Sequence, residues 1–270
     1  MNQQVHLDLP IELEEFRSSI ENSLLPLNKI HPFSKRTALM DSKFSGIAYL
    51  PQQHTYPKDI NGRQMFLLAQ INFSQEKLVY PFPKEGILQF FISPTIFNTN
   101  QTVEEHLFQH YFKVRYFPEV LPLEHLQIET SCIELPLIES FPIGEEMGLV
   151  FSSGVEPISA MDYRIEDYLR KPLSHYKSTS SDEKSIEDIY FELFLGAEHK
   201  IGGYPYFIYP DTRKNSPFLR RFDTLLLQII SNDEENIMWG DSGIIKFFIN
   251  KQKLLNLDFS DIYFIAEQYE

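Results

Sequence analysis

The apolar residues of this chain gather in short runs of strand length, separated by segments rich in proline, glycine and charged residues. Apolar runs of about four to eight residues bounded by turn signals are typical of β-strands buried on both faces. Weaker runs that alternate between apolar and polar residues indicate further strands. The pattern predicts strands at 44–50, 65–73, 87–93, 107–117, 201–209, 223–231, 244–250 and 259–267, and strands with irregular links across 118–160.

Three other segments carry apolar residues at helical spacing. The first is 9–25, where Leu13, Phe16 and Ile20 share one face and Pro10 fits the first turn. The second is a short helix at 160–171. The third begins at a polar stretch in which Ser181 is the expected N-cap, and it stops near Gly196.

The chain repeats itself at a nearly constant offset. Gly86–Ile92 (Gly-Ile-Leu-Gln-Phe-Phe-Ile) returns as Gly243–Ile249 (Gly-Ile-Ile-Lys-Phe-Phe-Ile), 157 residues later. Gln70 and Gln228 stand at matching positions of two other apolar runs, 158 residues apart, and Gly46 is echoed by Gly203. This period is far longer than the repeats that build solenoids, so the repeat indicates duplication of a whole sheet unit.

Strands and helices in this arrangement predict an α+β fold with an internal duplication. We expect two mainly antiparallel sheet units related by a pseudo-twofold, with a few flanking helices. Residues 1–150 hold the first repeat with the N-terminal helix, and residues 151–270 hold the second. The two are expected to pack as one compact unit, and a binding site would then form at their seam.

The formal net charge of −14 narrows the class of partner. A nucleic-acid binder needs a basic face to neutralise phosphates, and the sequence has no dense cluster of lysine and arginine. We therefore expect no nucleic acid, and we expect a basic protein as the partner if there is one. The alternative interpretation is that the acidic balance only keeps the protein soluble.

The remaining signals exclude several kinds of chemistry. Cys132 is the only cysteine, so neither an intrachain disulfide nor a cysteine-based zinc site can form. The motifs of zinc proteases, phosphate-binding loops and dinucleotide-binding folds are absent, so we predict no metal and no cofactor. Neither a signal peptide nor an apolar run of membrane-spanning length is present, which predicts a cytoplasmic protein with no membrane contact. The sequence does not determine the oligomeric state.

A family resemblance is carried by six segments, which span about residues 40 to 267: Phe66–Phe73, Gly86–Phe91, His199–Pro205, Leu225–Ile229, Ile237–Gly243 and Asp258–Asp261. Together they resemble the YwqG-like family of bacterial proteins, a domain of unknown function. The sequence departs from the family at Ser45-Gly46, where a Gly-Gly pair is more common. The resemblance implies an α+β fold with an internal duplication, and it implies no mechanism and no catalytic residues.

The strongest candidate for a local site is the turn around Trp239, Asp241 and Ser242, which the first repeat lacks. An exposed tryptophan beside a carboxylate and a hydroxyl would suit a ligand or a partner. The structural interpretation, which we prefer, is a turn whose side chains bond to the backbone.

Three further candidates lie elsewhere in the chain. His199, before a glycine pair, would serve as a general base or a ligand, although local hydrogen bonding is the simpler role. Asp211 and Arg213 would anchor a ligand, but a local ion pair at a turn is preferred. Lys113 and Arg115 share one face of a predicted strand, which we interpret as a solvated face.

The sequence thus favours a binding or interaction protein without catalysis, for example an immunity-type protein that neutralises a basic bacterial toxin. One alternative is a hydrolase in which Asp241, His199 and Asp211 converge at the seam. Another is a small-molecule sensor whose seam pocket is lined by Trp239 and tyrosines.

Overall fold

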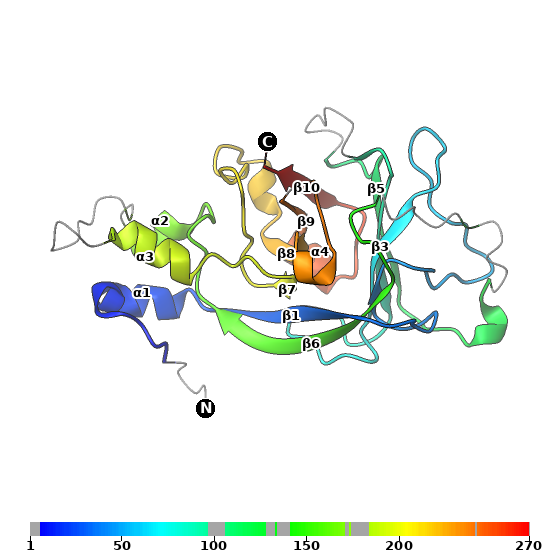
Figure 1. Cartoon of the computed structure of the whole chain (residues 1–270), viewed down its shortest axis with the longest axis horizontal. Coiled ribbons are helices and arrows are strands. Elements are labelled where there is room, and N and C mark those ends of the chain that lie inside the picture. Colours follow the sequence, from blue (N-terminus) through cyan, green and yellow to red (C-terminus); the bar gives the residue numbers. More distant parts are fainter. Residues whose placement is uncertain are drawn as a thin grey trace.

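The computed structural model describes residues 6–96, 106–127, 133, 141–170, 173, 184–240 and 242–269. Within these residues, ten strands form one antiparallel sheet in the order β10-β9-β8-β7-β1-β6-β2-β3-β4-β5 (Figure 1). The strands are β1 (Leu25–Ser34), β2 (Lys43–Phe44), β3 (Phe66–Asn72), β4 (Ile87–Ile92), β5 (Phe112–Phe117), β6 (Met147–Glu156), β7 (Lys200–Gly202), β8 (Thr224–Ile230), β9 (Gly243–Ile249) and β10 (Ile262–Gln268).

The helices are short and lie outside the sheet. α2 and α3 gather with η1 and α1 at one end of the molecule, beyond the ends of β1 and β6 (Figure 1). The helical elements are η1 (Ile11–Phe16), α1 (Arg17–Asn22), η3 (Leu123–His125), α2 (Ile165–Leu169), α3 (Ile186–Leu193), η5 (Leu219–Arg221), η6 (Asp233–Glu235) and α4 (Lys251–Leu255). No helix of the described chain has the length and apolar character needed to cross a bilayer.

The prediction of an α+β fold with mainly antiparallel sheet is confirmed, and most strand positions agree with the sequence pattern. Some details differ. The strands predicted at 44–50 and 201–209 shrink to β2 and β7, and the helix predicted at 9–25 is a 3₁₀ segment followed by six α-helical residues. The N-cap of α3 is Ser185, which forms a capping box with Asp188. Ser181 lies outside the described residues.

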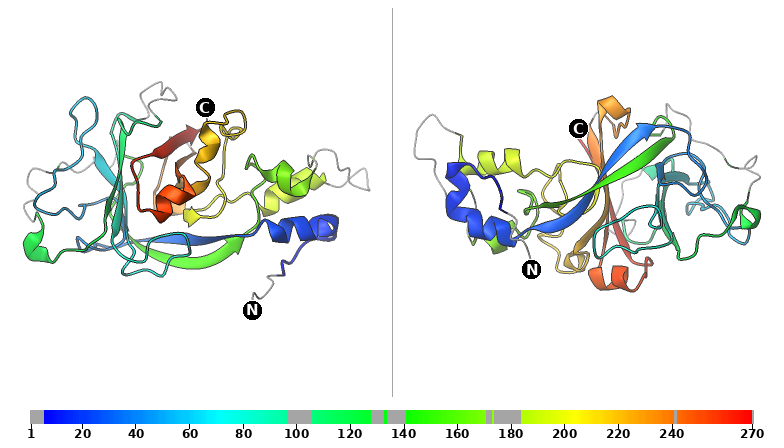
Figure 2. Two further views of the ribbon diagram at one scale, coloured as in Figure 1. Left: turned by 180° about the vertical axis from the view of Figure 1, so that it is seen from behind. Right: turned by 90° about the horizontal axis from the view of Figure 1, so that it is seen from below.

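The sheet is curled so that its two ends pack against each other (Figure 2). Phe90 of β4 contacts Phe247 of β9 at a centroid distance of 4.9 Å, and Phe112 of β5 stacks on Phe264 of β10 at 5.0 Å. One apolar core, drawn from both ends of the sheet, fills the curl. Other apolar clusters cover the outer faces, which explains why β3, β4 and β9 are buried along their whole length.

The two four-stranded ends of the sheet have matching registers. Ile92 pairs with Phe112 across β4 and β5, and Ile249 pairs with Ile262 across β9 and β10. Both β3 and β8 contain a register shift at the same place, between Leu67 and Ala69 in one and between Leu225 and Leu227 in the other. The four strands β2–β5 therefore correspond position by position to β7–β10.

The two glutamines singled out by the repeat hold equivalent turns. Gln70 Oε1 accepts the backbone N–H of Tyr49, and Gln228 Oε1 accepts that of Tyr206, each at 2.8 Å. The side-chain amides donate to carbonyls that also stand 157 residues apart, namely Leu39 and Asp41 in one case and Gly196 and Glu198 in the other. Both glutamines are fully buried, so these bonds satisfy polar groups that would otherwise be costly.

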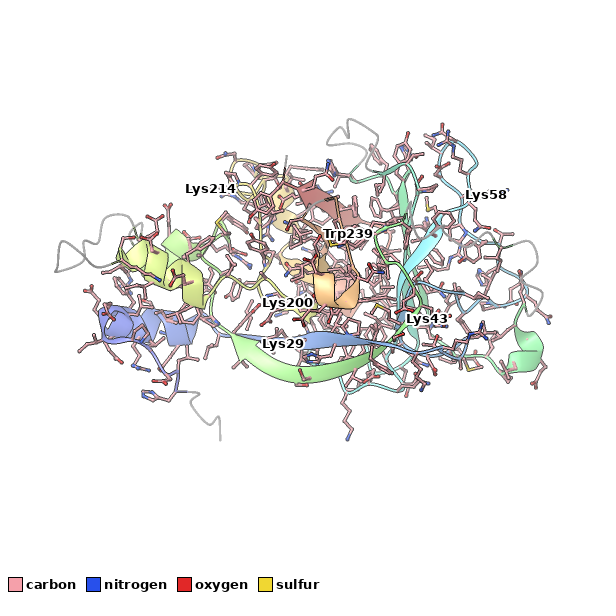
Figure 3. The ribbon with its side chains drawn as sticks, viewed as in Figure 1. Lys29, Lys43, Lys58, Lys200, Lys214 and Trp239 are labelled. Carbon is pink, nitrogen blue, oxygen red and sulfur yellow. The ribbon has the colours of Figure 1, made fainter. Side chains whose placement is uncertain are left out.

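Two buried lysines are equivalent in the same way. Lys43 and Lys200 are almost inaccessible, and Figure 3 shows Lys200 beside the central strand β1. Lys200 Nζ donates to both carboxylate oxygens of Glu156 at 2.7 and 2.8 Å, while Lys43 Nζ lies 3.7 Å from Glu146. Burial lowers the pKa of each lysine, and the neighbouring carboxylate opposes that shift.

The departure at Ser45 leaves the first turn unchanged. Ser45 and Gly46 have φ values of +58° and +78°, and Gly202 and Gly203 have +72° and +66°. Ser45 therefore holds a left-handed conformation that glycine adopts without strain.

A third buried lysine distinguishes the two ends of the sheet. Lys246 stands where the first end has Gln89, and both side chains donate to an equivalent backbone carbonyl, that of Tyr206 or Tyr49. Lys246 also bonds Glu267 at 2.8 Å. Its complete burial lowers its pKa to about 8, against the attraction of Glu267.

This pair predicts a pH-dependent stability. Between pH 8 and 10.5 the unfolded chain holds a proton on Lys246 that the folded chain releases, so the free energy of unfolding should rise with pH through this window. Chemical denaturation at several pH values measures the slope. The Lys246→Gln/Glu267→Gln double variant, which copies Gln89, is expected to lose that rise. An identical slope in both proteins would contradict the assignment.

Candidate functional site

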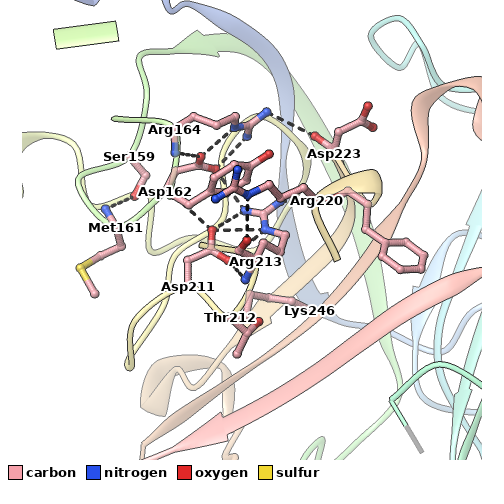
Figure 4. A network of polar contacts seen from close by, with 12 residues as sticks. Ser159, Met161, Asp162, Arg164, Asp211, Thr212, Arg213, Arg220, Asp223 and Lys246 are labelled. Atoms are coloured by element: carbon pink, nitrogen blue, oxygen red, sulfur yellow. Dashed lines mark hydrogen bonds and ion pairs between the residues drawn. The ribbon is translucent and has the colours of Figure 1, made fainter. Parts of the chain in front are cut away.

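The Asp211–Arg213 turn is the centre of a buried network of polar side chains (Figure 4). Arg213 is fully buried, and its guanidinium donates Nε and Nη2 to Asp211 at 2.7–3.2 Å. The backbone N–H of Arg213 also donates to Asp211 at 2.9 Å, and that of Tyr163 does so at 3.2 Å. The local ion pair expected from the sequence is present, and it is buried.

The network continues to a second carboxylate that the sequence did not indicate. Arg213 Nη2 lies 3.2 Å from Asp162, which also accepts Nε and Nη2 of Arg164 at 2.7 and 2.8 Å. Burial alone raises the pKa of Asp162, but the bonds from Arg164 and the charge of Arg213 outweigh it, so the pKa is lowered. The Asp162 carboxylate is thus held ionised between Arg164 and Arg213.

Aromatic rings enclose the Arg213 guanidinium. Its central carbon lies 4.5 Å from the ring centroid of Phe248, 5.0 Å from Tyr163 and 5.6 Å from Phe207. Nη1 donates to the carbonyl of Phe222 at 3.1 Å. With its donors used internally and its faces covered, Arg213 joins the segment that precedes α2, the 207–213 loop and strand β9.

The buried His199 side chain forms hydrogen bonds within the protein. Its Nδ1 accepts the backbone N–H of Ile230 at 3.2 Å, so Nε2 carries the proton and donates to Glu235 at 2.6 Å. The ring packs edge-on against Phe44 at 5.9 Å, and only 5% of the residue is exposed. These contacts fit the local structural role that the sequence favoured.

The turn around Trp239 does not fit the functional interpretation, which required an exposed tryptophan. Trp239 is 1% exposed and belongs to the core inside the curled sheet, as Figure 3 shows, so it is no exposed anchor. Its backbone N–H donates to Ser231 Oγ, which also accepts the N–H of Gly243. Ser242 is exposed, and its carbonyl accepts the N–H of Tyr269. Asp241 lies outside the described residues.

Two polar groups of the hydrolase hypothesis, His199 and Asp211, bond to different partners in the described part of the chain. His199 bonds Glu235 and Ile230, whereas Asp211 bonds Arg213 and Tyr163, and the two sets share no partner among the described residues. The same described part of the chain contains no group of three histidine, cysteine, aspartate or glutamate residues placed to hold a metal ion.

The helical end of the molecule concentrates negative charge. We call residues 8–22, 162–170 and 184–198 the helical lobe; its apolar core includes Leu13, Ile20 and Tyr190. The lobe has twelve carboxylates against four lysines and arginines, so a small part of the chain carries more than half of the net charge of −14.

A cleft separates this lobe from the 210–214 loop. It has a volume of about 280 Å³, and Glu166, Glu187 and the network residues Asp162 and Asp211 line it together with the apolar Leu169. Among the described residues, Lys214 is the exposed basic partner of Glu166, at 3.1 Å, and the other three carboxylates have none. Sequence reasoning missed this cleft because its walls come from segments about 20 to 50 residues apart.

The network predicts a large difference between two neighbouring residues. Arg213→Met would leave the buried Asp211 without its main partner and remove one of the two arginines beside Asp162. The expected cost is about 3–5 kcal/mol in the free energy of unfolding. Lys214→Met removes only a surface ion pair, and its effect should stay within about 0.5 kcal/mol. Urea denaturation compares the two. Equal destabilisation by both substitutions would show that the network is not a structural centre.

Comparison with known proteins gives one family match. The model of a domain of unknown function, DUF1963, matches residues 42–267, which include every segment that carried the resemblance stated from the sequence. No curated protein matches the chain. Since the match covers most of its length, the chain belongs to the DUF1963 family of domains of unknown function.

Proposed function

We propose that this protein is a non-catalytic binding protein whose helical lobe engages a basic protein partner. The observation that carries the proposal is the concentration of negative charge on the lobe. The internal roles of His199, Asp211 and Arg213 favour binding over the hydrolase alternative, because these groups already bond to their own protein. A cytoplasmic location is part of the same proposal.

The lobe offers open carboxylates beside apolar side chains. Several exposed acids of the lobe form no salt bridge with any residue described by the structure, and among them are Glu12, Glu15, Asp167 and Glu187. Ile11 and Leu193 on the same lobe are 83% and 50% exposed. Apolar anchors with a charged rim are the usual anatomy of a protein interface, and the acidic rim selects a basic partner.

The internal duplication belongs to this proposal. We infer that β2–β5 and β7–β10 derive from one duplicated sheet unit, related by a pseudo-twofold that passes between β1 and β6. The matched registers and the equivalent bonds of Gln70 and Gln228 support it. The helical lobe has no counterpart at the other end of the described sheet, so the partner would bind one end only.

The proposal predicts a salt-sensitive interaction that depends on the lobe. Affinity capture from the native host should recover a basic protein at about 0.1 M salt and lose it near 1 M, where the Debye length falls to about 3 Å. Replacing the four open acids (Glu12→Gln, Glu15→Gln, Asp167→Asn, Glu187→Gln) should abolish the capture, because the attraction is mainly electrostatic.

A matched variant controls for overall charge. Glu119, Glu124, Glu145 and Glu234 are exposed and lie outside the lobe, and changing all four to glutamine removes the same charge. This control should retain the partner, and both variants should keep the wild-type melting temperature. Capture that both variants lose equally, or that neither loses, would overturn the proposal. For the immunity-type version, the captured protein must be toxic to cells that lack this chain.

A further inference from the structure

The seam between the two ends of the sheet contains a roomy groove. Its volume is about 600 Å³, more than twice that of the cleft beside the helical lobe. Lys113 and Arg115 of β5 form one wall, and Phe218, Arg221 and Phe259 form the other. We call this feature the seam groove.

The seam groove has a positive charge balance in an acidic protein. It is lined by three cations and one carboxylate, Asp261, which lies 3.2 Å from Arg221. Neither Lys113 nor Arg115 forms a salt bridge with any residue in the described part of the chain. Arg115 is partly buried, and its hydrogen bond goes to the neutral carbonyl of Thr55. A cation withdrawn from water without a carboxylate partner is costly, and a bound anion would offset that cost.

The common fold does not require these cations. The register of β5 on β4 matches that of β10 on β9, so Lys113 corresponds to Tyr263 and Arg115 to Ile265. Tyr263 and Ile265 are buried in an apolar cluster, whereas Lys113 is exposed. The same strand face that is covered with apolar side chains at one end therefore presents charge at the other.

Aromatic rings accompany the cations. Phe108 and Phe218 are 61% and 56% exposed where they line the groove. The central carbon of the Arg221 guanidinium lies 3.7 Å from the ring centroid of Phe218, and Tyr116 packs against Phe259 at 5.1 Å. Exposed rings beside guanidinium groups provide stacking surfaces for a flat ligand, with the charge placed for an acidic group.

The edge of β5 is already occupied beside the groove. The backbone N–H of Val114 donates to Gln109 Oε1 at 2.9 Å, while Gln109 Nε2 donates to the carbonyls of Phe259 and Ser260. This bridge takes up a donor that an added peptide strand would need, so the geometry favours a small ligand over strand addition.

We propose that the seam groove binds a small organic anion in which a phosphate or carboxylate group is joined to a flat ring. The acidic group lies against Lys113 and Arg115, and the ring stacks among Phe108 and Phe218. This binding is independent of the helical lobe, which is acidic and excludes such ligands.

Calorimetric titration of the full chain tests the proposal with four probes. Inorganic phosphate supplies the acid alone and adenosine the ring alone, while adenosine monophosphate and benzoate combine a ring with a phosphate or a carboxylate. At least one of the last two should bind at least about tenfold tighter than phosphate and adenosine. Which of them binds identifies the acidic group. Phosphate binding as tightly as both combined probes, or no binding of either up to about 10 mM, would overturn the proposal.

Two exposed lysines provide matched variants. Lys113→Glu reverses a charge in the groove and should weaken binding at least about tenfold. Lys35→Glu makes the same change at an exposed site that does not line the groove, and it should leave the affinity unchanged. Phe108→Ala should also weaken binding, whereas the exposed Ile11→Ala should not. Equal losses from Lys113→Glu and Lys35→Glu would refute a specific site.

Discussion

The covering of apolar strands on both faces is the constraint on which this structure depends. β3, β4, β8 and β9 are apolar almost throughout, so a flat sheet would leave one face in water. Curling the sheet brings Phe90 against Phe247 and closes a common core. The outer faces are then covered by smaller apolar clusters, and the helices are free to form a separate lobe.

Polar groups inside these strands follow from the same constraint. Gln70, Gln228, Lys200 and Lys246 sit where water cannot reach, so each must bond within the protein. Their partners are turns and carboxylates from other segments, which fixes the loops around the sheet. Residues that are attractive as catalytic groups in the sequence, such as His199 and Arg213, have this same fixing role.

Surface charge distinguishes two candidate binding regions, the helical lobe and the seam groove. The helical lobe is acidic, whereas Lys113 and Arg115 of the seam groove have no carboxylate partner in the described chain. In the sequence, features found in only one of the two repeat copies were candidates for function. In the structure, the residues that differ between the two copies have other roles than the sequence indicated. Trp239 lies in the core, whereas Lys113 and Arg115 stand at positions where the second copy has the buried Tyr263 and Ile265.

The sequence by itself determined the strands of the two sheet ends, since period and propensity are local properties, and it paired Gln70 with Gln228 through the repeat. It missed β1, whose Pro26 and Pro32 argue against a central strand. β7 pairs with β1 only over Leu27–Lys29, so neither proline needs a donor on that side. Only the tertiary structure decided strand pairing and burial, because both depend on which distant segments meet. β1 meets β6, Asp162 meets Arg213, and β5 faces the 259–261 segment across the seam groove.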